Sequence, residues 1–397
     1  MPEASSIGKR IARARKLRDL SQAGLAAKVP CSKSLIAQVE RGHKPATPQF
    51  IAAVATALSV DVTELTGQPY RGTSAHTDRI HAAIAEIRQA LAYWDIAPEL
   101  HASPRSLREL AGEIEQVRRL RMEASYVQLG AVLPQLIKEL TVQIHVLGGS
   151  DRAQAFGLLS DAYTAVDSMA YKLGYLDLFA LAVERMAWAA IQSDDPLLRP
   201  VAAMRRSSVF LATGGWDGGM ALLERAGREM GSDVSGDAGQ SVYGTLHLRS
   251  SILAARADRP GAAWESIGAA AEVAGRLGRD TRDYGLLFGP TNVAIHGVAV
   301  AVELGDADEA VRRSENLALP DDLPRERSSH HFIDLARAWM WQRRPDKALA
   351  CVMRAEHLAP QRTRYHPMAR QTVTQLLDYQ RRLPEPLRGI ATRMDLP

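Results

Sequence analysis

Residues 21–42 of this chain read SQAGLAAKVPCSKSLIAQVERG, and their pattern predicts two short helices joined by a tight turn. Ser21 and Ser32 are residue types that cap the first turn of a helix. Apolar residues follow each of them at helical spacing, and a glycine ends the second segment. We therefore expect one helix over about 22–29 and another over 32–41. This is the layout of a helix-turn-helix, in which the second helix enters the major groove of DNA.

The flanking sequence predicts three more helices. Apolar residues at helical spacing indicate a helix over about 7–18. Thr47 followed by Pro48 is a typical helix start, and the apolar pattern then runs to about Leu58. Asp61 and Glu64 have the spacing of a capping box and predict a short fifth helix.

Five small helices in this order resemble the Cro/C1-type (XRE family) helix-turn-helix domain over residues 7–66. The matching motifs are LSQ at 20–22, LAAK at 25–28, S-x-S-x-I at 32–36 and ERG at 40–42. The resemblance implies that the helix over 32–41 reads DNA. One residue departs from the family pattern, because Pro30 stands where glycine is usual. Proline fixes φ near −65°, which leaves the tilt of the reading helix open.

The outward positions of the reading helix carry side chains suited to base edges. Lys33 can donate to guanine, Gln38 can pair with adenine, and Ser34 can contact either. Other polar and basic residues around the motif are suited to phosphates. The predicted DNA-contacting residues are Gln22, Ser32, Lys33, Ser34, Gln38, Arg41, Arg10 and Lys44. The resemblance also implies a structural ion pair between Arg15 and Glu40.

Charge is concentrated in the same region. Residues 1–70 contain 10 Lys and Arg against 5 Asp and Glu, a net charge of +5. The other residues contain 39 basic and 40 acidic side chains, a net charge of −1. A local positive field of this kind favours a partner rich in phosphate, such as double-stranded operator DNA.

Composition excludes several classes of protein. Two cysteines among 397 residues rule out a disulfide framework, and no run of 18 apolar residues predicts a membrane span. We expect a cytoplasmic bacterial protein that contacts no membrane. None of the common catalytic, nucleotide-binding or metal-binding motifs is present. The prediction is therefore no enzyme, no cofactor and no metal.

The rest of the chain reads as helices behind a linker. Residues 69–77 are rich in small and turn-forming residues. They divide the chain into a helix-turn-helix domain over 1–68 and a helical domain over 78–397. We expect helices over 78–93 and from about 103 onward.

Four similar segments in the second domain indicate a repeat. They begin at Gly215, Asp258, Gly305 and Arg344, and each follows an apolar helix. If Met220, Ala263, Ala310 and Ala348 are equivalent, the spacings are 43, 47 and 38 residues. This pattern resembles degenerate tetratricopeptide (TPR) repeats and predicts an all-α chain, in which an α-solenoid of TPR-like hairpins follows the five-helix domain. Residues 150–380 should hold about five hairpins.

Polar residues inside apolar helices are the candidates for ligand contact. Tyr243 and His247 are four residues apart, as are Asn292 and His296, so each pair shares one helix face. Such groups can bind a peptide or small molecule, or they can simply hydrogen-bond to one another.

Together these patterns favour a DNA-binding transcription regulator of the XRE family. Because one module contacts half of a typical operator, we expect a homodimer. A helix-turn-helix followed by TPR-like repeats resembles the peptide-sensing quorum regulators of bacteria, which implies control by a peptide or small-molecule effector. The alternative is a TPR-like protein-interaction scaffold in which DNA binding is secondary or lost.

Overall fold

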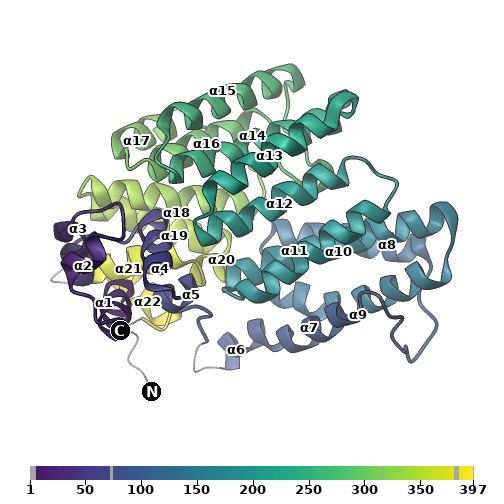
Figure 1. Cartoon of the computed structure of the whole chain (residues 1–397), viewed down its shortest axis with the longest axis horizontal. Helices are drawn as coiled ribbons and strands as arrows, with labels where there is room; N and C mark the ends of the chain where they lie inside the picture. The colour runs from purple at the N-terminus through teal and green to yellow at the C-terminus, as the bar shows by residue number, and fades with distance from the viewer. Residues whose placement is uncertain (1–5, 72–74, 316, 380–383, 397) are drawn as a thin grey trace.

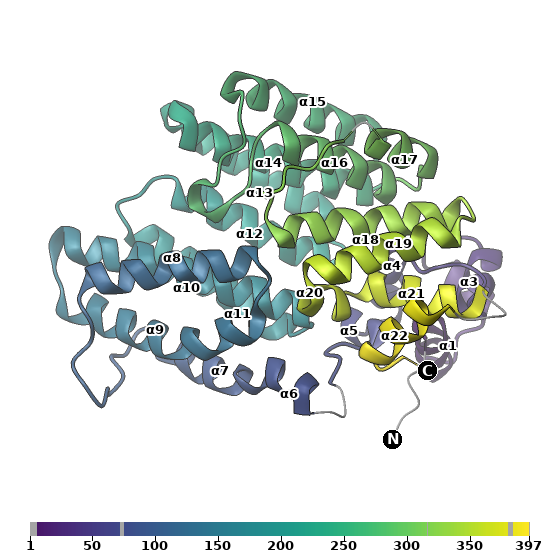
Figure 2. The same cartoon turned by 180° about the vertical axis from the view of Figure 1, so that it is seen from behind.

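The computed structural model describes residues 6–71, 75–315, 317–379 and 384–396. Within these ranges the chain is helical, with one isolated antiparallel bridge between Thr281 and Phe288 and no strand. The predicted all-α class is confirmed. Figures 1 and 2 show a small N-terminal module beside the last helices of the chain, while stacked helical hairpins form the rest. No helix of the described part is long and apolar enough to cross a bilayer.

The N-terminal module contains the five predicted helices, and each begins at a capping side chain. Ser6, Ser21, Ser32, Thr47 and Asp61 each accept a hydrogen bond from a backbone N–H in the first turn that follows. Such caps satisfy N–H groups that have no partner within the helix. The helices are α1 (Ile7–Leu17), α2 (Gln22–Ala26), α3 (Lys33–Glu40), α4 (Pro48–Leu58) and α5 (Val62–Thr66).

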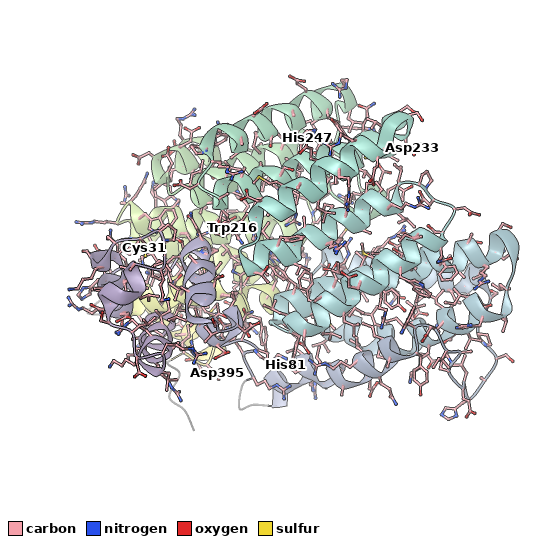
Figure 3. The ribbon with its side chains drawn as sticks, viewed as in Figure 1. Cys31, His81, Trp216, Asp233, His247 and Asp395 are labelled. Carbon is pink, nitrogen blue, oxygen red and sulfur yellow. The ribbon has the colours of Figure 1, made fainter. Side chains whose placement is uncertain are left out.

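Pro30 is accommodated by a three-residue turn. The N–H of Cys31 donates to the carbonyl oxygen of Val29 at 2.7 Å, closing a γ-type turn around the proline. The residue before a proline avoids helical geometry, so α2 does not extend to Val29 as predicted; it ends at Ala26. Cys31 lies in this turn at the outer edge of the module (Figure 3), and partial burial raises the pKa of its thiol.

Helical hairpins make up most of the remaining chain. Two helices, α6 (Ala75–Ala82) and α7 (Ile84–Ala92), precede them. Short 3-10 turns, η1 (Gly231–Val234) and η2 (Asp283–Gly285), lie in the longer connections. The hairpin helices are α8 (Leu107–Met122) and α9 (Tyr126–Val146), α10 (Gly149–Leu173) and α11 (Leu176–Gln192), α12 (Leu198–Thr213) and α13 (Trp216–Met230), α14 (Gly236–Arg256) and α15 (Pro260–Leu277), α16 (Pro290–Glu303) and α17 (Ala307–Glu315), and α18 (Arg325–Trp341) and α19 (Pro345–Leu358).

One turn geometry closes all six of these hairpins. A residue with positive φ lies one or two positions after the end of the first helix, and the N–H of the next residue donates to the carbonyl oxygen five positions earlier. This is the Schellman pattern of helix ends. The shared turn identifies a structural repeat even where the turn residue is not glycine. The positive-φ residues are Ala124, Gly174, Gly214, Asp258, Gly305 and Arg343.

The equivalence proposed for Met220 is wrong by one residue. Ala263, Ala310 and Ala348 are each the fourth residue of their helix and fully buried, but the fourth residue of α13 is Gly219. A Cβ added to Gly219 would lie 3.0 Å from the side chain of Leu253 in α14. A small residue here lets neighbouring helices approach closely.

Two predicted boundaries also differ from the structure. The helix expected over 78–93 is broken at Ala83 into α6 and α7. The helix expected from about 103 starts at Leu107, because Ser106 and Glu109 form a capping box. Of the predicted linker 69–77, residues 72–74 lie outside the described residues.

The module shares a hydrophobic core with the last helices. This core joins buried residues of α1–α5 to those of α18, α19, α21 (Pro367–Tyr379) and α22 (Glu385–Arg393). The short α20 (Pro360–Arg364) precedes α21. The side-chain amide of Gln371 on α21 pairs with the backbone of Ala46, its nitrogen 3.0 Å from the carbonyl oxygen and its oxygen 2.7 Å from the N–H. The module is therefore docked on the repeats by packing as well as by its chain connection.

Candidate functional site

The outer face of α3 carries the residues predicted to read bases. Figures 1 and 2 both place α3 at the edge of the molecule. Lys33 and Ser34 are exposed, while Gln38 is partly buried and donates to the Ser34 hydroxyl at 3.2 Å. The exposed Ser32 caps the helix, and its hydroxyl accepts from the N–H of Leu35. This face has the donors and acceptors that base edges require.

A buried ion pair supports α3 from behind. Arg15 on α1 donates from Nε and Nη2 to the two carboxylate oxygens of Glu40, at 2.7 and 2.9 Å. Burial acts to raise the pKa of Glu40, but the bonds from Arg15 and Gln22 outweigh it and lower that pKa. Arg15 also donates to the carbonyl oxygen of Leu20 at 2.6 Å. These contacts tie α1 to the end of α3.

Gln22 belongs to this network. Its side-chain amide donates to the Glu40 carboxylate at 2.8 Å. The residue was predicted to hold a phosphate, and the structure gives its amide nitrogen a structural partner. Gln22 thereby links the start of α2 to the end of α3.

Three predicted phosphate ligands line one groove. Arg41 and Lys44 are exposed just after α3, and together with Arg10 they border a space of about 540 Å³ between the module and α21. Arg10 donates to the carbonyl oxygen of Thr66 at 3.2 Å, and burial lowers the pKa of its guanidinium. The side chain of Arg10 is thus held against α5, whereas the side chains of Arg41 and Lys44 are exposed to solvent.

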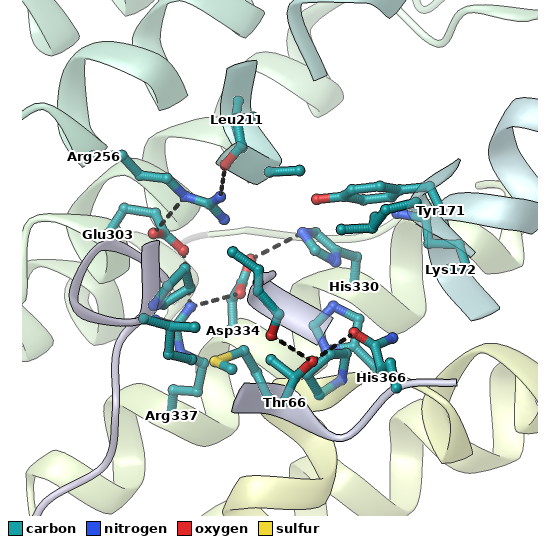
Figure 4. Close-up of a pocket in the computed structure, with 18 of the residues that line it drawn as sticks. Thr66, Tyr171, Lys172, Leu211, Arg256, Glu303, His330, Asp334, Arg337 and His366 are labelled. Atoms are coloured by element: carbon teal, nitrogen blue, oxygen red, sulfur yellow. Dashed lines mark hydrogen bonds and ion pairs between the residues drawn. The ribbon is translucent and has the colours of Figure 1, made fainter. Parts of the chain in front are cut away.

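A second region of interest is a cavity between the module and the repeats, here called the interdomain cavity. It has a volume of about 150 Å³. Pro48, Ile51, Val62 and Thr66 form the wall on the module side. The opposite wall comes largely from the first helices of the hairpins (Figure 4). Whatever occupies this cavity touches both parts of the protein.

Charged groups in the interdomain cavity form a connected chain of contacts (Figure 4). Glu303 accepts from Arg256 and from Arg337, both at 3.0 Å. Burial acts to raise the pKa of Glu303, but these two cations lower it to about 2. Asp334 lies 3.3 Å from Arg337 and 3.5 Å from His330, and burial raises its pKa to about 6.

An adjoining cavity lies among the first helices of the hairpins. Its volume is about 160 Å³, and it shares Tyr171 and Lys172 with the interdomain cavity. Because five basic side chains line it, it is here called the cationic cavity. These side chains are Arg121, Lys172, Arg205, Arg249 and Arg327.

The four predicted ligand contacts separate into two places. Asn292 and His296 line the cationic cavity. Tyr243 and His247 of α14 do not line it, and their rings pack edge to face, with centroids 4.8 Å apart. Tyr243 packs against α13 and against the hydrophobic cluster that includes α15, and His247 is labelled in Figure 3. The spacing of four placed each pair on one helix face, but it could not tell which face is turned inward.

Sequence reasoning missed the five cations. Part of their signal was present, because Arg205 (next to Arg206) and Arg249 interrupt runs of small and apolar residues in α12 and α14. A charge inside such a helix is costly unless it is paired or functional. Deciding that these cations meet required the register of several hairpins.

Comparison with known proteins identifies the module. Residues 6–66 match the family model described as "Helix-turn-helix domain". The N-terminal module is a helix-turn-helix domain, a class of DNA-binding module.

Among solved structures, the chain is similar to PlcR of Bacillus thuringiensis in complex with the peptide PapR7 and DNA. The identity is 11%, the TM-score is 0.35, and the match covers 88% of this chain and 99% of that one. It is also similar to Rgg2, the SHP pheromone receptor of Streptococcus dysgalactiae, at 13% identity and a TM-score of 0.21. That match covers 69% of this chain and 94% of the other. No curated protein sequence matches the chain.

Proposed function

We propose that this protein is a sequence-specific transcription regulator that binds operator DNA as a homodimer, through residues 1–68, under control of an effector bound to residues 78–397. The observation that carries the proposal is the outer face of α3. Lys33, Ser34 and Gln38 are presented together there, on a helix braced from behind by Arg15 and Glu40. An enzymatic role finds no comparable support.

The role assigned to each residue follows from its position. Lys33, Ser34 and Gln38 would contact base edges, whereas Arg41 and Lys44 would contact the phosphates that flank them. Gln22 and Ser32 lie at helix starts, where backbone N–H groups favour an anion. Arg10 would act mainly through the fold of the module, because it is bonded to Thr66.

Control by an effector is supported by the interdomain cavity. A peptide or small molecule in that cavity would contact α4 and α5 of the module together with the first helices of the repeats. Occupancy would change the free energy of docking of the module, and with it the placement of two α3 helices in a dimer. A ligand shifts such an equilibrium only through different affinities for the two arrangements.

The test is a footprint of the full-length protein on the DNA upstream of its own gene, using wild type, Gln38→Ala and Lys44→Ala. We expect a protected site for wild type, a loss of base preference for Gln38→Ala and weaker binding to every sequence for Lys44→Ala. If both variants weaken specific and random DNA equally, α3 does not read bases. An absent footprint combined with a stable protein partner would support the scaffold alternative.

A further inference from the structure

The cationic cavity contains more positive charge than its own acids balance. Two carboxylates face the five cations, and both are already engaged. Asp167 lies 3.3 Å from Arg205. Glu326 lies 3.6 Å from Lys172 and 2.6 Å from Arg362.

Three of the arginines have no carboxylate partner among the described residues. Arg121 donates to the carbonyl oxygen of Gly285. The acceptor of Arg249 is the sulfur of Met204, at 3.8 Å. Arg327 forms no ion pair, and its Nε is buried without a hydrogen-bond partner in the described structure. Burying an uncompensated cation costs several kcal/mol. The cavity therefore lacks the negative charge that would balance these arginines.

The electrostatics agree with the geometry. Burial, reinforced by the charge of Arg205, lowers the pKa of Arg121 and of Arg249 to about 10. Burial, reinforced by Arg362, lowers the pKa of Lys172 to about 7. Each of these cations would be stabilised by a negative charge within the cavity.

The same cavity also offers unused acceptors. Asn292 is 2% exposed, and its amide nitrogen donates to the carbonyl oxygen of Leu287 at 2.6 Å. Its Oδ1 has no hydrogen-bond donor among the described residues. His296 shares a hydrogen bond between Nδ1 and the backbone oxygen of Asn292 at 2.9 Å, and burial lowers its pKa to about 3. The neutral ring therefore donates from Nδ1 and can accept at Nε2.

We propose that the cationic cavity binds a small organic molecule that carries a dianionic group, a phosphate ester or a dicarboxylate, and at least one hydroxyl or N–H donor. The dianionic group would lie against Arg121, Arg249 and Arg327, and the donor would meet Asn292. A peptide terminus supplies one negative charge, whereas three arginines lack a carboxylate partner among the described residues. Guanidinium groups bind phosphate and carboxylate through paired hydrogen bonds.

This inference rests on the proposed function and places the dianionic group of its effector in the cationic cavity, which adjoins the interdomain cavity at Tyr171 and Lys172. Its test needs no DNA. Full-length protein is titrated by calorimetry and by thermal unfolding with pyrophosphate, glycerol 3-phosphate and malate at matched ionic strength. Acetylglycine, a monocarboxylate, is the control. We expect saturable binding of at least one dianion and none of acetylglycine. A response to the phosphates alone identifies a phosphate site, and a response to malate alone identifies a dicarboxylate site.

Arg249→Met tests the site itself, with Arg276→Met on the exposed side of α15 as the matched control. Loss of one charged hydrogen-bond donor should weaken the dianion by about 10- to 100-fold. Because the substitution removes an uncompensated buried charge, the ligand-free variant should unfold at the same or a higher temperature than wild type. Arg276→Met should change neither quantity.

Two results would overturn the inference. One is no saturable response to any dianion. The other is an unfolding temperature that falls in Arg249→Met while the response to the dianion stays at the wild-type level, since that would make Arg249 a structural residue. Dianion binding without any effect on an operator footprint would leave the cavity assignment standing and remove the regulatory role. A footprint without dianion binding would overturn the cavity assignment and leave the proposed DNA binding standing.

Discussion

Gly8 lies so close to Val39 that a Cβ added to Gly8 would stand 2.0 Å from the carbonyl oxygen of Val39. The first helix of the module therefore packs backbone to backbone against the end of α3. Because backbone cannot move aside as a flexible side chain can, this contact sets the position of the reading helix.

Gly8→Ala should consequently destabilise the module and displace α3. Overpacking typically costs about 1–3 kcal/mol, and this contact involves backbone on both sides. Gly112→Ala in α8 is the matched control, because a Cβ there meets nothing within 4 Å. That control should be neutral or stabilising by up to about 1 kcal/mol. Urea denaturation measures the free energy of unfolding of both variants. A wild-type value for Gly8→Ala would show that the close contact with Val39 does not contribute to stability.

Glu40→Ala should cost about 3–5 kcal/mol, since it leaves Arg15 buried without its partner. Glu224→Ala is the control, because Glu224 is 70% exposed and pairs with Arg228 on the surface, where such pairs contribute ~0–1 kcal/mol. Thermal unfolding of the two variants at neutral pH makes the comparison. Equal losses would mean that the Arg15–Glu40 pair is no more important than a surface pair.

The same pair predicts an acid dependence of stability. The folded pKa of Glu40 lies below its ordinary value of 4.5. The unfolded chain therefore binds the proton more readily, and the contribution of Glu40 is complete above pH 4.5 and lost as the pH falls through the folded pKa. Denaturation curves of wild type and Glu40→Gln should converge in this acidic window. A stability difference between the two proteins that stays constant with pH would exclude a link between the protonation of Glu40 and stability.

Lys172 predicts a second dependence of the same sign, in a higher pH window. Its folded pKa of about 7 lies below the ordinary value of 10.5, because burial and Arg362 disfavour the cation more than Glu326 favours it. The unfolded chain therefore binds more protons between these values, and stability rises with pH there, by up to ~1.4 kcal/mol per pH unit. The rise should be smaller in Lys172→Met. Lys28→Met, at an exposed position, should keep the wild-type slope.

Gln371→Ala should loosen the docked module without unfolding it. The substitution removes two hydrogen bonds to the backbone of Ala46, each worth about 0.5–1.5 kcal/mol. Hydrogen exchange should therefore accelerate at residues 45–47 and along α21. Gln375→Ala, on the same helix and beside the same groove, is the control. Equal exchange in both variants would show that the Gln371 contact does not hold the module.

Operator binding should respond differently at two positions of the module. Gln38→Ala should cost about 1–3 kcal/mol at the operator and leave random DNA unaffected, whereas Lys44→Ala should weaken both and reduce the salt slope by about 1. Fluorescence anisotropy over a range of salt concentrations separates the two effects.

The module was predictable because its determinants are local. Ser21, Ser32 and Thr47 mark helix starts within a few residues of the turns they define. The hairpin turns were less visible, because Asp258 and Arg343 adopt the positive φ that glycine adopts at Gly174. A shared backbone conformation need not be accompanied by a shared residue type, so the sequence alone does not reveal it.

The interior was harder still. Asn292 and His296 could be selected as polar residues on one face, yet the same rule selected Tyr243 and His247, which pack elsewhere. The inward direction of a helix depends on its neighbours, which lie some forty residues away in the repeat. The contact of Ala46 with Gln371 has no local signal at all.

The shared core of the module and the last helices has a consequence for synthesis of the protein. The ribosome releases the module first, while α21 and α22 are made roughly 15–60 s later at ~5–20 residues per second. During that interval the apolar surface of the module that packs against the last helices is uncovered, and the helix-turn-helix lacks the contacts that dock it on the repeats. A nascent chain therefore passes through a stage in which an undocked helix-turn-helix domain exposes an apolar surface. Completion of the polypeptide ends that stage.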